Sequence, residues 1–96
     1  MFVGTWRHDL GSDSYQVLEF KSNGTGRDYF MYPDPDKKHW QDIIGQQPVI
    51  IENESHFTYV HTDENVVIDN DAVIYFIDGG VLYKDNWDFR KVNNKD

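Results

Sequence analysis

The 96-residue sequence contains no cysteine, so it has neither a disulfide framework nor a thiolate that could bind a metal or act as a nucleophile. No apolar run approaches the about 18 residues of a membrane-spanning helix, and no transmembrane segment is expected. Cations are scarce, with nine Lys and Arg against 17 Asp and Glu and a net charge of -8. Because such a chain repels phosphate, nucleic-acid binding is not expected either.

Aromatic side chains supply much of the apolar content of the chain. Six Phe, six Tyr and three Trp make up much of the apolar content of 39%. Strands favour aromatic and β-branched side chains, so the composition indicates an all-β protein. A chain of this length has enough apolar surface for a single core. We therefore expect one domain that covers residues 1–96.

Alternating polarity and tight turns predict a series of hairpins. In residues 15–21, Leu18 and Phe20 lie on one face of the expected strand and Glu19 lies on the other. An Asn23-Gly24 turn follows, and Gly79-Gly80 gives a second strong hairpin signal. The expected strands are 3–7, 15–21, 25–32, 49–51, 56–62, 66–69, 72–78, 81–84 and 87–92.

Unpaired strand edges invite aggregation, so this many hairpins favour closure. The predicted fold is an antiparallel up-and-down meander, closed or nearly closed into a small barrel of about eight strands. Two segments interrupt the pattern. Residues 8–14 have the composition of a polar connector, and residues 37–47 fit either a short helix or an irregular strand.

Three segments resemble the small bacterial lipocalin-like domains. They are Val3-Gly4-Thr5-Trp6, Leu18-x-Phe20 followed by Asn23-Gly24-Thr25-Gly26, and Trp87-Asp88-Phe89-Arg90-Lys91-Val92. The resemblance implies a lipocalin-like barrel in which Trp6 plugs the closed end beneath Arg90 or Lys91. The chain is much shorter than the larger lipocalins, which argues against a roomy ligand cavity.

Six aromatic side chains fall on strand faces that we expect to point inward. They are Phe20, Phe57, Tyr59, Phe76, Trp87 and Phe89. Such a lining could enclose a small apolar ligand, and these six are the predicted ligand-binding residues. The alternative is that they simply fill the barrel, as side chains do in small eight-stranded examples.

The strand at 72–78 is apolar on both faces. With Phe76 assigned to the core, the other face carries Val73, Tyr75 and Ile77. A loop, the segment of Trp40, Ile43 and Ile44, or another chain would cover that face, and the other chain could be a second copy in a homodimer. The predicted interface consists of Trp40, Ile43, Val73, Tyr75 and Ile77.

No pattern in the sequence indicates catalysis or a bound cofactor. His39, His56 and His61 lack the spacing of metal ligands, and no nucleophile, zinc or phosphate-loop motif is present. No metal, no cofactor and no enzymatic activity are predicted. An enzyme would instead reveal itself by a cleft with two or more strongly perturbed titratable groups.

The predicted function is therefore a non-enzymatic lipocalin-like binding module for a small apolar ligand or a protein partner. The alternative is a small acidic inhibitor or immunity-type protein that neutralises a basic protein partner, which the net charge favours. The cytoplasm is expected if Met1 is the native start. Export or a lipoprotein is expected if an upstream signal has been removed.

Overall fold

A computed structural model describes residues 2–41, 43–44, 47–70 and 72–92, and these residues form nine β-strands and no helix. The strands are β1 (Gly4–Gly11), β2 (Ser14–Phe20), β3 (Thr25–Pro33), β4 (Ile43–Ile44), β5 (Gln47–His61), β6 (Asn65–Ile68), β7 (Val73–Asp78), β8 (Val81–Lys84) and β9 (Trp87–Lys91). Among the described residues there is accordingly no helix that could cross a lipid bilayer.

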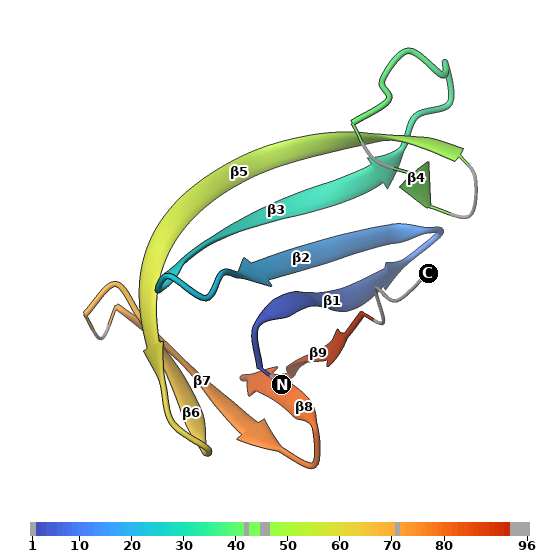
Figure 1. Cartoon of the computed structure of the whole chain (residues 1–96). Coiled ribbons are helices and arrows are strands. Elements are labelled where there is room, and N and C mark those ends of the chain that lie inside the picture. Colours follow the sequence, from blue (N-terminus) through green and yellow to red (C-terminus); the bar gives the residue numbers. More distant parts are fainter. Residues whose placement is uncertain (1, 42, 45–46, 71, 93–96) are drawn as a thin grey trace.

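Eight of the strands close into a barrel (Figure 1). Around the ring the order is β3-β2-β1-β9-β8-β7-β6-β5, every pair is antiparallel, and β5 returns to pair with β3. The short β4 adds to the beginning of β5. The prediction of an all-β up-and-down barrel of about eight strands is confirmed.

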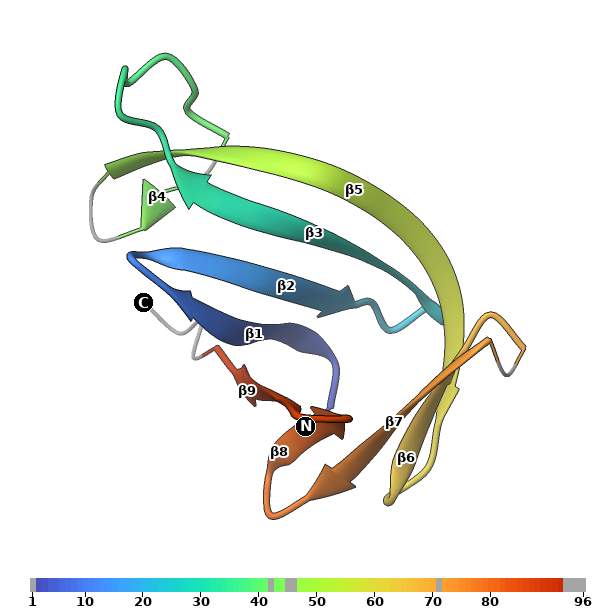
Figure 2. The ribbon, with the colours of Figure 1, turned by 180° about the vertical axis from the view of Figure 1, so that it is seen from behind.

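The longest strand, β5, covers two strands that the sequence analysis expected separately, at 49–51 and 56–62. It curves around one side of the barrel in Figure 1, and Figure 2 shows the same strand from behind. Its register against β3 shifts between Asp28 and Phe30, where Asn53 has a φ of 57°. A bulge of this kind adds a residue and bends the strand without ending its pairing. The polar stretch around Asn53 is thus a bend, although it resembles a loop.

The predicted connector at residues 8–14 is wrong. Strand β1 continues to Gly11, and only Ser12 and Asp13 form the turn, with φ values of 54° and 61°. Two residues of positive φ fit the right-handed twist of a hairpin. The end of β1 is exposed, so its polar side chains remain in water while its backbone stays paired. The Gly79-Gly80 turn is confirmed.

Aromatic rings fill the end of the barrel where β1 begins, which we call the closed end. Trp6 is 4% exposed, and its Nε1 donates a hydrogen bond of 2.9 Å to the carbonyl oxygen of Phe2. The Phe2 ring lies 4.6 Å from that of Phe20. Of the two cations expected over Trp6, Lys91 is the one that lies over the ring, with its Nζ 5.8 Å from the ring centre.

A second apolar cluster lies on the outer face of β2, β3 and β5. Its buried members are Val17, Tyr29, Met31 and Val49, and Ile44 of β4 packs against them.

The segment at residues 37–47, expected as a short helix or an irregular strand, contains no helix within its described part. It forms an irregular loop and the two-residue β4, while residues 42, 45 and 46 lie outside the described residues.

Candidate functional site

The barrel has an open end opposite Trp6. Because the strands alternate in direction, this end gathers the beginnings of β2, β7 and β9 and the end of β8. A cavity of about 200 Å³ lies there. Its lining consists of Gln16, Val73, Tyr75, Lys84, Asp85, Trp87 and Phe89.

The six aromatic residues predicted to bind a ligand divide into three groups. Trp87 and Phe89 line the cavity. Phe20, Phe57 and Tyr59 are buried and pack in the same core as Trp6, at the closed end. The inward placement of Phe76 is wrong, because its side chain is 58% exposed on the outside of the barrel.

Strand β7 faces the opposite way from the prediction. Tyr75 is 6% exposed, and Val73 and Ile77 pack against the core. The reason lies in the pairing with β6, where Tyr75 is opposite the buried Val66 and Val73 is opposite the buried Ile68. Directly paired residues lie on the same face of the sheet. Since both faces of β7 are apolar, the pairing with β6 determines which of them points into the barrel.

Asp28, a residue that the sequence analysis did not single out, lies beside the cavity. It pairs with Leu18, which is fully buried, so its side chain is on the interior face of the barrel. Gln16 of the cavity lining is its diagonal neighbour on that face. Burial raises the pKa of Asp28, and none of the ion pairs between described residues includes this carboxylate.

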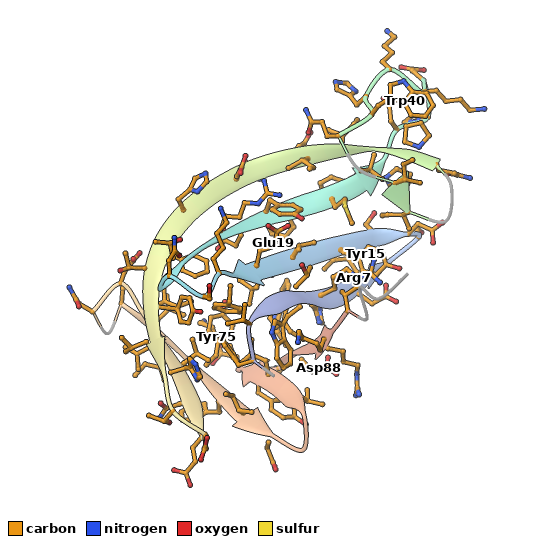
Figure 3. All side chains as sticks on the ribbon, in the orientation of Figure 1. Arg7, Tyr15, Glu19, Trp40, Tyr75 and Asp88 are labelled. Atoms are coloured by element: carbon orange, nitrogen blue, oxygen red, sulfur yellow. The ribbon has the colours of Figure 1, made fainter. Side chains whose placement is uncertain are left out.

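The hydroxyl group of Tyr75 is a further polar group of the interior, besides Asp28 and Gln16. Burial first, and then the charge of Asp28, raise the pKa of Tyr75 to about 12. No hydrogen bond joins this hydroxyl to another described residue, although the ring is almost completely buried. Figure 3 shows Tyr75 within the ring of strands. Its hydroxyl is therefore available to a molecule in the cavity.

The rim of the cavity carries a paired cation and a fixed indole ring. Lys84 Nζ lies 3.2 Å from Asp85 Oδ2, and both side chains are exposed. The His8 ring lies 4.4 Å from the Trp87 ring, and its Nδ1 is 2.8 Å from the carbonyl oxygen of Asp88. Trp87 is 38% exposed because it stands at the mouth.

The loop before β4 presents the remaining predicted interface residues. The buried Asp34 accepts hydrogen bonds from the backbone N–H groups of Asp36, Lys38 and His39 and contacts His39 Nδ1 at 2.8 Å. The contact with His39 and these N–H groups hold the pKa of Asp34 well below its usual range. Trp40 is 67% exposed on this loop (Figure 3).

Four exposed apolar side chains and the half-buried Val67 also gather on the outer face of β5 to β8. Val60 pairs with Val67, which pairs with Ile74, and Phe76 pairs with Tyr83. Val60 is 68% exposed and Phe76 58%. We call these five residues the outer apolar face. Ile43, also exposed, lies on β4 and is not part of it.

No family model, no curated protein and no solved structure matches this chain. Among the described residues, no three His, Asp or Glu side chains are grouped as a metal site would require. Asp28 was missed because the sequence shows only an aspartate in a polar stretch, and Tyr75 was predicted at an interface because it lies in a strand that is apolar on both faces. Only the closure of β3 and β7 into one barrel brings them together.

Proposed function

We propose that this protein is a non-enzymatic binding module that holds a small, largely apolar molecule at the open end of a lipocalin-like barrel. The observation that carries the proposal is the cavity of about 200 Å³ bounded by the rings of Tyr75, Trp87 and Phe89. A cavity of about 150 Å³ can hold benzene, so this one has room for a single ring with a short substituent. The interior of the closed end is filled by the rings of Phe2, Trp6 and Phe20.

The perturbed groups favour binding over catalysis. Burial raises the pKa of two titratable groups near the cleft, Asp28 and Tyr75, but the shift is large for Tyr75 alone. However, the pKa of Tyr75 moves away from neutral pH, and a proton-transfer group works best with a pKa near the operating pH. A hydroxyl that stays protonated is suited to a fixed hydrogen bond with a ligand.

Filling the cavity tests the proposal. We expect Val73→Phe to abolish the saturation-transfer NMR signals that one-ring compounds give with the wild-type protein, because the larger ring occupies their space. Ile74→Phe is the matched control, since Ile74 is the next residue of β7 and faces outward. Equal signals from both variants, or none from the wild type, would refute binding at the open end.

A second candidate function, binding of a basic protein partner, is favoured by the outer apolar face. Its rings are next to exposed acids, among them Glu64 and Asp78. Large exposed apolar patches mark protein contacts, and acidic surroundings steer a basic partner. A second copy of this chain is the other occupant. Sedimentation of the wild type and of Phe76→Ser separates them, because only a homodimer would change its sedimentation coefficient.

A further inference from the structure

The half-buried carboxylate of Asp28 lies in the interior of the barrel and has no positive partner within the described part of the chain. Asp28 lies on the same interior face as Leu18, and no described cation forms an ion pair with it. An ionised carboxylate that loses water without gaining a partner is costly. A bound cation would remove this cost, whereas a bound anion would add to it.

The lysine that lines the cavity, Lys84, is already engaged. Its Nζ lies 3.2 Å from Asp85 Oδ2 at the exposed rim. Lys84 and the Asp28 carboxylate of the interior form no ion pair with each other.

The hydroxyl of Tyr75 gives a second indication of a polar ligand group. Tyr75 is 94% buried, since 6% of its surface is exposed, it lines the cavity, and no hydrogen bond joins its hydroxyl to a described residue. No fully buried polar atom among the described side chains lacks a hydrogen bond, so this unpaired hydroxyl oxygen is open to the cavity and can bind a group placed there. Asp28 faces the same interior, diagonally across from Gln16 of the cavity lining, and its charge acts on Tyr75.

The aromatic lining of the cavity also favours a cationic ligand. The rings of Tyr75, Trp87 and Phe89 surround the cavity, and aromatic faces attract ammonium groups as well as apolar bodies. The net charge of -8 raises the local concentration of cations around the molecule. Both features act against a carboxylate or phosphate ligand.

We propose that the cavity binds a small organic amine, with its ammonium group between Asp28 and the Tyr75 hydroxyl and its apolar body against Trp87 and Phe89. The inference rests on the proposed function and specifies its ligand class. The ammonium donates hydrogen bonds to the Asp28 carboxylate and to the hydroxyl oxygen of Tyr75. The ring or short chain of the amine fills the outer part of the cavity.

Three probes of nearly equal shape test the inference by calorimetry at neutral pH and low salt: 2-phenylethylamine, 2-phenylethanol and 3-phenylpropionate. We expect the amine to bind about ten- to a hundredfold more tightly than the alcohol, as hydrogen bonds to charged groups are stronger. Asp28→Asn should remove this preference, and Tyr75→Phe should reduce it. Asp85→Asn neutralises the carboxylate at the rim and shows whether the rim recognises the amine. Asp63→Asn is the matched control, because it neutralises an exposed carboxylate in the turn before β6, outside the cavity, and it should change the affinity less than about threefold.

The possible results distinguish an error in the ligand class from an error in the location of the binding site. If the alcohol or the propionate binds as tightly as the amine and Val73→Phe removes that binding, the site is confirmed and the amine inference is overturned. If Asp85→Asn weakens the amine as much as Asp28→Asn does, the rim is the recognition site and the inference is again overturned. If no probe binds, both the proposed function and the inference fail. Circular dichroism of each variant shows that it is folded.

Discussion

Two aspartates associated with β3 illustrate how surroundings decide what a single residue does. Asp34, just after the strand, is buried among N–H donors that stabilise its charged form and lower its pKa. Asp28, within the strand, is desolvated without such donors, and its pKa is raised. The first carboxylate stabilises a loop, and the second is costly in the free protein. Neither role is readable from the residue type.

We expect Asp28→Asn to increase the free energy of unfolding near neutral pH by up to about 1 kcal/mol, because it removes a poorly solvated charge. The folded-state pKa of Asp28 is higher than the value of about 3.9 in the unfolded chain, so the folded protein takes up the proton first. The gain should therefore shrink as the pH falls toward about 3.9. Urea unfolding of both proteins as a function of pH measures it, and a destabilised Asp28→Asn would contradict the assignment.

Asp34→Asn should act in the opposite direction. Because the folded-state pKa of Asp34 is depressed, its charge stabilises the protein above the unfolded value of about 3.9, and this contribution is lost as the pH falls through the folded pKa. The variant should be less stable than the wild type at neutral pH and approach it in acid. The same urea series measures this, and a difference that does not depend on pH would show that the charge is not involved.

Individual strands show how far a sequence determines its own placement. The hairpin of β2 and β3 was predictable because Leu18 and Phe20 alternate with charged residues, which fixes the buried face. Strand β7 has apolar residues on both faces, so the face that it buries depends on its register with Val66 and Ile68 of β6. The cavity lies partly on β7, and its lining could not be predicted for the same reason.

A matched pair of substitutions in β7 tests this assignment. We expect Tyr75→Thr to reduce the free energy of unfolding by about 2–4 kcal/mol, because it empties a packed position of the core. Phe76→Thr should change it by less than about 0.5 kcal/mol, since the ring is exposed and threonine suits a strand. Chemical denaturation compares the two. A larger loss from Phe76→Thr would mean that the strand faces the other way.

The molecule as a whole combines a filled end with an open one. Rings from Phe2, Trp6 and Phe20 close the barrel where β1 begins, and the cavity lies where β2, β7 and β9 begin. The outer cluster around Met31 and the loop held by Asp34 stabilise the longer strands beyond the cavity. This division places the packed core at one end and the proposed recognition site at the other.

The most direct test of this account is a ¹H–¹⁵N NMR titration of the wild-type protein with 2-phenylethylamine. Binding at the open end predicts that the largest chemical-shift changes fall on Val73, Tyr75 and Trp87, with Asp28 among them, while the signals of Phe2 and Phe20 at the closed end stay in place. Changes confined to the outer apolar face around Phe76, or no changes at all, would contradict it.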